Sequence, residues 1–348
     1  MHTVLDNEQI INQRDPQDAL GVAAEQARQV NFPAVVACPE HDSREINNVV
    51  VTGMGGSALA ALVVKAWLAQ ELTVPFEIVR GYDLPASVDS RTLVIASSYS
   101  GNTEETLSAL DQARRRDAQI GVIASGGQLI DIAEAAGIAH VKLPAGFQPR
   151  MAVLYNLRSL VKLLENFGVV ENKTAELESL SDWLAEQTSA WNAGVAFEDN
   201  LAKQIADHAA GKTAVFYGSS ITSPVAYKWK ISWNENAKNV AFWNEYPEFN
   251  HNEFMGWASH PVDKPFAVFD LRSKLDHPQI NKRFEVSDRL LSGRRPKAWT
   301  IDLAGDSLVA QLLWGSILAD YASIYLAVLN GINPTPVDLI EQLKRELA

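Results

Sequence analysis

Two short loops, about forty residues apart, carry groups that are suited to binding an anion. The first loop, Gly53–Ser57, is rich in glycine, and the second, Ser97–Thr103, holds four serine and threonine hydroxyls around Gly101. A phosphate group can be held by backbone N–H groups at a helix start and by hydroxyls, without a cation. Four hydroxyls and a glycine exceed what N-capping of one helix requires. The two loops together predict a site for a phosphorylated small molecule.

The first loop, taken alone, has other interpretations. Gly53–Ala58 fits the pattern G-x-G-x-x-[GA] of dinucleotide-binding turns. Such a domain uses an acidic residue after its second strand for NAD, but the corresponding segment, Phe76–Arg80, ends in an arginine that would at best suit NADP. A tight strand-to-helix turn without any ligand fits the same residues. Both alternatives stay open on this loop alone.

A second group of polar residues lies between positions 228 and 257. Glu235 stands between two asparagines, and so does His251. Because asparagine is a poor helix and strand former, its repeated use suggests a functional site. Glu235 is suited to act as a general base, and His251 as a general acid or base near neutral pH. The alternative is that Glu235 ends a helix in solvent and that His251 lies on a surface loop.

Arg150 follows Gln148 and Pro149 at the expected start of a helix, where the helix dipole disfavours a cation. An anionic partner would explain this position, and a surface arginine is the alternative. His251 and Glu253 could share one face of a strand, but no second histidine has ligand spacing. We therefore expect neither a metal nor a cofactor.

The elements that must position these residues follow an α/β pattern. Asn48–Thr52 and Thr92–Ala96 are typical of buried parallel strands, so the two loops that follow them should lie at one edge of a sheet. The other expected strands are Phe76–Val79, Gln119–Ala124, His140–Leu143, Ala214–Tyr217, Ala267–Leu271 and Trp299–Leu303. The expected helices are Gln17–Val30, Ala58–Leu68, Glu104–Arg114, Arg150–Phe167, Leu177–Asp199, Val225–Trp233, Ser307–Leu329 and Pro336–Leu347.

A length of 348 residues suits two domains. We expect a helical lead-in over 1–47, a first α/β domain with the phosphate-binding loops over 48–170, and a helical bridge over 171–211. A second α/β domain over 212–348 would carry Glu235 and His251. Each domain should be a parallel sheet flanked by helices.

The overall composition excludes several classes of protein. A formal net charge of −12 argues against nucleic acid, and it requires a phosphate to be held by local groups. Cys38 is the only cysteine, which excludes disulfides and favours a reducing cytoplasm. No uninterrupted apolar run approaches about eighteen residues, so we expect no transmembrane helix. The first residues lack the basic start and apolar core of a signal peptide.

An ordered set of motifs resembles a known family. The set consists of Gly53–Ser57, Ser98–Thr106, Gln148–Arg150, Asn234–Lys238, Pro247–Glu253 and the pattern P-x-x-x-I-x-x-L-K from Pro336 to Lys344. It resembles the bifunctional phosphoglucose/phosphomannose isomerases of the sugar isomerase (SIS) domain group. The first two motifs alone would indicate any SIS domain that binds a sugar phosphate, whereas the asparagine-flanked motifs are more specific.

The resemblance implies a fold, an activity and a role for each motif residue. The fold would be two SIS-type domains with a flavodoxin-like three-layer architecture. Glu235 would move a proton between C1 and C2 of a sugar 6-phosphate, and Arg150 would stabilise the enediolate. His251, donated by the neighbouring subunit of a homodimer, and Lys344 would assist ring opening. The phosphate would bind at Gly55, Gly56, Ser57, Ser98, Ser100 and Thr103.

The activity implied is the interconversion of glucose 6-phosphate or mannose 6-phosphate with fructose 6-phosphate. Five aromatic residues lie around the motif Pro247–Glu253 and leave the sugar preference open. They are Phe242, Trp243, Tyr246, Phe249 and Trp257. The alternatives are a non-catalytic SIS-domain sensor of a sugar phosphate, an isomerase of another phosphosugar, and an NADP-dependent oxidoreductase.

Overall fold

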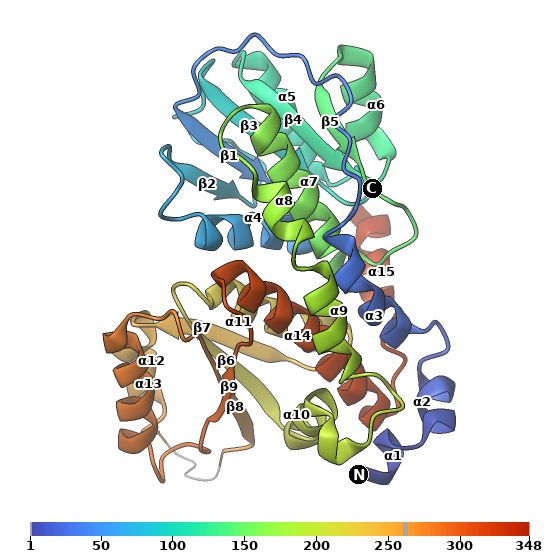
Figure 1. Cartoon of the computed structure of the whole chain (residues 1–348), viewed down its shortest axis with the longest axis vertical. Helices are drawn as coiled ribbons and strands as arrows, with labels where there is room; N and C mark the ends of the chain where they lie inside the picture. The colour runs from blue at the N-terminus through green and yellow to red at the C-terminus, as the bar shows by residue number, and fades with distance from the viewer. Residues whose placement is uncertain (1, 260–263, 348) are drawn as a thin grey trace. The chain divides into compact units, whose positions relative to one another are not determined.

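The computed structural model describes residues 2–259 and 264–347, which form two compact units (Figure 1). Gln26–Trp183 forms one of them, which we call the inserted unit. Met1–Glu25 and Leu184–Ala348 form the other, which we call the discontinuous unit because its two segments flank the inserted unit in the sequence. Each unit is built on one parallel sheet, which confirms the predicted α/β class.

The sheet of the inserted unit has five parallel strands in the order β2-β1-β3-β4-β5. This is the strand order of flavodoxin-like folds. The register pairs Asn48 with Thr92 and Thr52 with Ala96, so β1 and β3 end together. The strands are β1 (Asn48–Thr52), β2 (Phe76–Val79), β3 (Thr92–Ser97), β4 (Gln119–Ala124) and β5 (Ala139–Lys142).

Helices cover both faces of this sheet. Alanines and leucines of α5 and α6 pack with Val50, Val94 and Val122 on one face, while α4 and α7 contact each other and the sheet on the opposite face. The helices are α4 (Gly55–Trp67), α5 (Glu104–Arg115), α6 (Gly127–Ala136), η1 (Pro149–Met151), α7 (Val153–Asn166) and α8 (Lys173–Glu178). A helix was predicted over Arg150–Phe167, but a 3₁₀ turn opens it and α7 proper begins at Val153.

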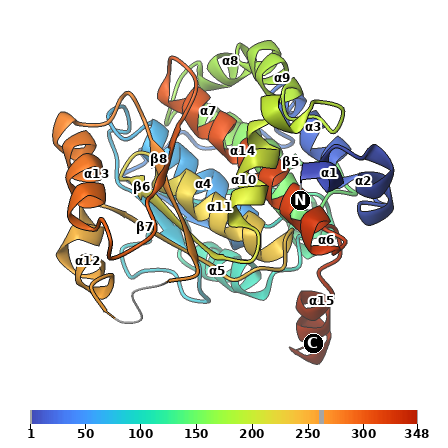
Figure 2. The same cartoon turned by 90° about the horizontal axis from the view of Figure 1, so that it is seen from below.

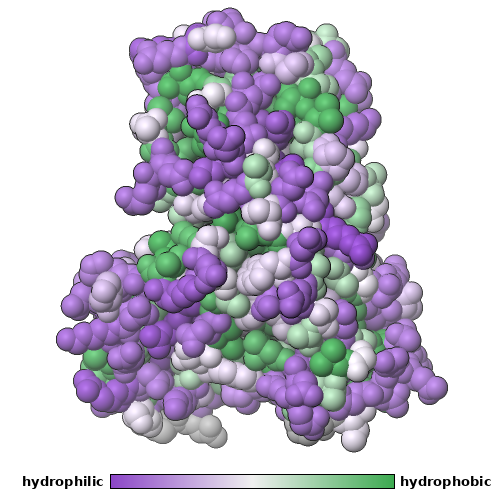
Figure 3. Space-filling model, in the orientation of Figure 1, coloured by the Kyte–Doolittle hydropathy of each residue, from purple (hydrophilic) through white to green (hydrophobic). Residues whose placement is uncertain are grey.

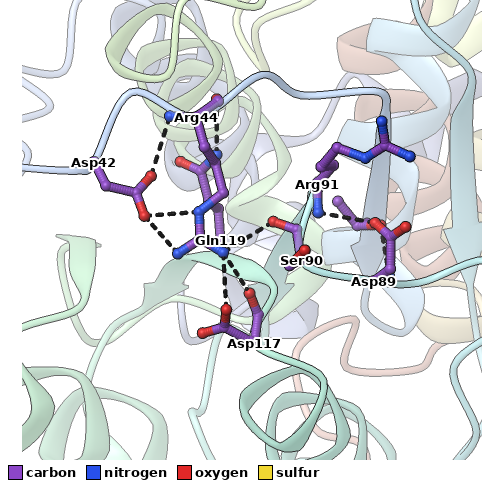
Figure 4. A network of polar contacts seen from close by, with 8 residues as sticks. Asp42, Arg44, Asp89, Ser90, Arg91, Asp117 and Gln119 are labelled. Atoms are coloured by element: carbon purple, nitrogen blue, oxygen red, sulfur yellow. Dashed lines mark hydrogen bonds and ion pairs between the residues drawn. The ribbon is translucent and has the colours of Figure 1, made fainter.

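An arginine ties the segment before β1 to the sheet (Figure 4). Arg44 donates to the Asp42 carboxylate at 2.7 Å and to the backbone carbonyls of Ser90 and Asp117 at 3.0 and 2.9 Å. Gln119 donates back to the Arg44 carbonyl at 3.1 Å. This segment contains no helix after Gln29, so the predicted helical lead-in over 1–47 is helical only in its first part.

The discontinuous unit has a four-stranded parallel sheet in the order β7-β6-β8-β9. Its strands are β6 (Thr213–Ser219), β7 (Ala241–Tyr246), β8 (Phe266–Arg272) and β9 (Trp299–Asp302). The helices with sequence numbers below 250 are α1 (His2–Leu5), α2 (Glu8–Arg14), α3 (Ala19–Gln29), α9 (Ser181–Ser189), η2 (Phe197–Asp199), α10 (Leu201–Ala209), α11 (Ser223–Glu235) and η3 (Glu248–His251). The later ones are α12 (Glu253–Gly256), α13 (Pro278–Leu290), α14 (Leu308–Asn330) and α15 (Asp338–Leu347).

Aromatic side chains dominate the core of the discontinuous unit. On one face of the sheet, Phe216 and Phe269 pack against Trp229 and Trp233 of α11. On the other face, Tyr217 and Tyr246 belong to a cluster with Phe284 of α13. Strand residues one position apart therefore face opposite layers, as the pleat requires.

The helix α14 runs through the middle of this unit, packed against α10 and α11 (Figure 2). Its length and composition are sufficient to cross a membrane, but 94% of its most apolar window is buried inside the fold. It is thus a core helix. Figure 3 shows mostly hydrophilic residues over the visible face of each unit, interrupted by smaller apolar patches.

Candidate active site

The first predicted phosphate loop joins β1 to α4 through glycines that the backbone requires. Gly55 adopts φ +51°, which disfavours residues with a side chain. A Cβ at Gly56 would lie 2.6 Å from the Pro149 carbonyl oxygen, so only glycine lets the start of α4 approach this turn. Ser57 is buried in the first turn of the helix.

The second predicted loop gathers its hydroxyls at the start of α5. The Ser98 Oγ lies 2.7 Å from the Thr103 Oγ1 and 3.5 Å from the Ser100 Oγ. The Ser98 Oγ also accepts from the Gly101 N–H at 3.2 Å, which closes the turn. Three hydroxyls gathered around Ser98 can rotate to donate to one anion, because hydroxyl hydrogens are free to reorient.

The two loops adjoin each other at the carboxyl edge of the sheet. A Cβ at Gly53 would lie 2.7 Å from the Ser97 carbonyl oxygen, so the first loop passes directly against the end of β3. The helix starts of α4 and α5 therefore carry their partial positive charges at one edge. The predicted common location of the two loops is confirmed within the inserted unit.

Arg150 lies in the turn η1, which packs against the start of α4. Only 2% of the residue is exposed, so it is not the surface arginine of the alternative interpretation. Its Nη1 donates to the Gln148 Oε1 at 3.4 Å. A buried guanidinium beside the Gly53–Ser57 loop adds a fixed positive charge to the predicted anion site.

Glu235 is the last residue of α11, and it is half-buried rather than fully solvated. Its neighbours hold the helix end. The Asn234 side chain donates to the Asn239 carbonyl at 2.8 Å, and Lys238 donates both to the Glu235 carbonyl and, at 3.0 Å, to the Pro334 carbonyl. The asparagines and the lysine around Glu235 thus serve to fix the turn in which it lies.

The motif around His251 divides its side chains between two tasks. Asn250 donates to the Ser287 Oγ at 2.9 Å, and Asn252 donates to the Glu248 carboxylate at 2.6 Å. Glu253 accepts from the Asn244 amide at 2.7 Å and from the Tyr217 hydroxyl. His251 itself, at the end of η3, is exposed. Its neighbours anchor the loop and leave the imidazole accessible.

The contact between Tyr217 and Glu253 is a strong anchor for this loop. Burial first, and then the adjacent Glu253 carboxylate, raise the pKa of the Tyr217 hydroxyl far above its usual range. The hydroxyl therefore stays protonated and donates to the carboxylate, while it accepts from the Trp257 Nε1 at 2.9 Å. The idea that His251 and Glu253 share one face of a strand is wrong, because η3 and α12 occupy this segment.

Lys344 lies on α15, whose side chains are exposed along the helix. The ammonium group forms an ion pair with Glu341, one turn earlier, at 2.9 Å. The linker to α15 contacts the end of α11 through Lys238 and Pro334. Glu235, His251 and Lys344 are thus carried by three separate elements of the discontinuous unit.

One surface pocket of about 200 Å³ lies elsewhere, at the amino ends of β4 and β5. It is lined by His41, Gln119 and Phe167, among others, and includes none of the predicted site residues. Within residues 2–259 and 264–347, no group of three or more histidine, cysteine, aspartate or glutamate side chains is arranged to hold a metal ion.

The chain matches two described families. Residues 44–140 match the SIS domain, and residues 198–347 match the bacterial phospho-glucose isomerase C-terminal SIS domain. The first match contains both predicted phosphate loops, and the second contains Glu235, His251 and Lys344.

Curated relatives cover most of the chain. A bifunctional phosphoglucose/phosphomannose isomerase of Caldicellulosiruptor bescii is 37% identical over 88% of this chain and 91% of its own length. The protein of the same name in Aquifex aeolicus is 33% identical over 88% and 92%. A D-glucosamine-6-phosphate 4-epimerase of Sulfolobus acidocaldarius is 33% identical, over 64% of this chain and 68% of its own length.

Solved structures support the fold. The C-terminal domain of glucosamine-fructose-6-phosphate aminotransferase from Francisella tularensis superimposes with a TM-score of 0.70, at 14% identity, over 91% of this chain and 98% of that one. At this low identity, the likeness shows a shared architecture and nothing more. The identity and coverage of the curated relatives go further, and they show that this chain belongs to the family of bifunctional phosphoglucose/phosphomannose isomerases.

Proposed function

We propose that the chain interconverts glucose 6-phosphate and mannose 6-phosphate with fructose 6-phosphate. One observation carries the proposal: Glu235 ends a helix whose final turn is held by Asn234 and Lys238, in a chain that also presents two adjoining hydroxyl- and glycine-rich loops. A sugar-phosphate sensor would use the loops but would have no need of a carboxylate held in this way. The curated relatives carry the same activity in their names.

Substrate binding would begin at the phosphate group. The hydroxyls of Ser98, Ser100 and Thr103 would donate to its oxygens, and the starts of α4 and α5, at Gly55–Ser57 and Glu104, would face its charge. The net charge of −12 means that these local groups must hold the anion. Binding energy from this unreactive group would keep C1 and C2 of the sugar in place for reaction.

The chemical step would be proton transfer between neighbouring carbons. The Glu235 carboxylate would remove the proton from C2 of the open-chain aldose; the C2–H electron pair would form the C1–C2 double bond, and the π electron pair of C1=O would move onto O1 to give an enediolate. The O2 hydroxyl proton would pass to O1, and as the C2=O double bond forms the protonated Glu235 would deliver its proton to C1 to give the ketose. Arg150, already buried as a cation, would stabilise the negative charge on the enediolate oxygen.

Ring opening would require a second set of groups. His251 and Lys344 are both exposed on the discontinuous unit and would move protons at the ring oxygen and the C1 hydroxyl. We include in the proposal that the chain is a cytoplasmic homodimer and that each His251 serves the site of the other subunit. The exposed imidazole on an anchored loop supports this assignment.

The test offers fructose 6-phosphate and quantifies both aldose phosphates as they form. Glu235→Gln should remove turnover while fructose 6-phosphate still protects the protein against thermal unfolding, because the amide cannot accept the proton but leaves the phosphate loops intact. Glu186→Gln, at an exposed position of α9, is the matched control and should retain wild-type rates. Full turnover by Glu235→Gln would refute the assignment of the base.

A second activity follows from the relative of Sulfolobus acidocaldarius, a D-glucosamine-6-phosphate 4-epimerase by name. That protein aligns with about two thirds of this chain, so glucosamine 6-phosphate should be offered as a substrate in the same assay. Conversion of glucosamine 6-phosphate, with fructose 6-phosphate unchanged, would move the proposal from aldose–ketose isomerisation to epimerisation.

A further inference from the structure

Three polar side chains on one face of α11 converge on a single carboxylate of α14. Lys228, Ser232 and Asn236 stand at intervals of four residues, so they lie in one row along the helix. Asp320 Oδ1 accepts from the Lys228 Nζ at 2.7 Å, from the Ser232 Oγ at 2.8 Å and from the Asn236 Nδ2 at 3.4 Å. Each of these four residues is at most 1% exposed.

This buried cluster occurs where the two helices are otherwise in tight contact. A Cβ at Gly315 would lie 2.8 Å from a Val225 methyl group, and the Trp229 Nε1 donates to the Gly315 carbonyl at 2.9 Å. Apolar side chains would fill such an interface at no desolvation cost, whereas a buried ion pair adds little net stability. A role that a buried pair can have instead is to fix the register between two helices.

The cluster ends next to the proposed base. Asn236 follows Glu235 directly, and its amide also donates to the Ser323 Oγ at 2.9 Å. Asn236 therefore ties the residue after Glu235 to α14 at two points. Lys238 ties the Glu235 carbonyl on the other side of the turn.

We infer that Asp320 is a positioning residue for Glu235. By holding Lys228, Ser232 and Asn236, it fixes the rotation and the end of α11, and so the direction in which the Glu235 carboxylate points. This inference rests on the proposed function, because it takes Glu235 to be the base. A displacement of about 1 Å at a reacting group can lower a rate about 100-fold, so the effect should be on the chemical step.

The experiment compares Asp320→Asn with Ser316→Ala in the full chain. Ser316 is buried on α14 one turn before Asp320, but its hydroxyl donates to the Leu312 carbonyl of its own helix, so it is a matched control. Asp320→Asn should lower kcat by about 100-fold with KM for fructose 6-phosphate within about twofold, and it should increase the deuterium isotope effect with substrate deuterated at the carbon that loses its proton. Ser316→Ala should change none of these.

A third variant separates positioning from folding. Lys228→Met combined with Asp320→Asn removes both charges of the buried pair, so no ammonium is buried without the Asp320 carboxylate, and thermal stability should recover relative to Asp320→Asn. The inference requires kcat to stay low in this double variant. Recovery of kcat together with stability, or an unchanged isotope effect in Asp320→Asn, would overturn it. Absence of isomerase activity in the unaltered protein would instead refute the proposed function.

Discussion

Asp270 lies in an environment far from that of an ordinary, solvated carboxylate. It lies on β8, where it is 2% exposed, and among the described residues its Oδ1 has no hydrogen-bond partner. Burial raises the pKa of Asp270 to about 7, although the Arg295 guanidinium opposes this rise. Asp288 adds a smaller upward effect. The folded protein therefore favours the protonated carboxyl at pH values where an unfolded chain would be ionised.

The sign of the resulting pH dependence is fixed. Between pH 4 and pH 7 the folded state binds a proton at Asp270 that the unfolded state lacks, so the free energy of unfolding should fall as the pH rises through this range. In Asp270→Asn this fall in the free energy of unfolding should be shallower by roughly 1 kcal/mol per pH unit. Urea unfolding of both proteins at pH 5 and pH 7 measures it. Parallel pH dependences would contradict the prediction.

At the residue scale, the sequence singles out candidate site residues but not the side chains that hold them in place. Glu235 and His251 stand out because asparagines flank them in the sequence. Asp320 does not, because a single aspartate in an apolar helix gives no sign that three side chains from a helix about ninety residues earlier meet it. The role of Tyr217 cannot be predicted from the sequence either, since its hydroxyl donates to Glu253 only because the fold brings β6 and α12 together.

At the scale of elements, the loop after β3 depends on close backbone approach. Gly101 adopts φ +72°, and a Cβ there would lie 1.8 Å from the Gly126 carbonyl oxygen in the loop after β4. The Gly101 carbonyl accepts from the Leu129 N–H at 3.0 Å, and the Asn102 side chain accepts from the Gln128 N–H at 3.0 Å. The hydroxyl-rich loop is thus built against a second glycine-containing loop.

Two alanine substitutions separate the cost of a positive φ from the cost of a steric clash between the new Cβ and a neighbouring backbone. Gly168 adopts φ +70°, but no atom lies within 4 Å of its Cβ position. Gly168→Ala should therefore cost about 1 kcal/mol of unfolding free energy, from strain alone. Gly101→Ala should cost roughly 2 kcal/mol more, because the Gly126 backbone must move. Chemical denaturation of both variants checks this, and equal losses would show that the loops separate freely.

Strands were predictable where a short run rich in apolar, β-branched residues stands between turn residues. Asn48–Thr52 and Phe76–Val79 have the predicted bounds, and a continuous apolar run also identifies β3. The edge strand β7 escaped notice because Ala241–Tyr246 mixes apolar residues with Asn244 and Glu245 and is only partly buried. The helix α13 lies outside every predicted helix, because it is largely polar with few buried side chains.

For the whole molecule, the question is how two subunits would share their residues. If each site takes His251 from the other subunit of a dimer, a heterodimer of one Glu235→Gln chain and one His251→Ala chain contains one site with both native residues. Isolated with two different affinity tags, it should show about half the wild-type turnover, while each parent homodimer is nearly inactive. An inactive heterodimer would show that His251 and Glu235 of one site come from the same subunit. A monomer in analytical ultracentrifugation would refute the shared site altogether.

The discontinuous unit also has a consequence for synthesis on the ribosome. Leu5 and Ile11 are buried, and Arg14 donates to the Val328 carbonyl at 2.5 Å, so the N-terminal helices are completed by α14. More than 300 residues separate these partners in the sequence, so at about 5–20 residues per second the ribosome makes them on the order of half a minute apart. The inserted unit is fully translated within that interval. Vectorial folding would therefore proceed from the middle of the chain outwards, with the side chains of Leu5 and Ile11 left uncovered until the last long helix emerges.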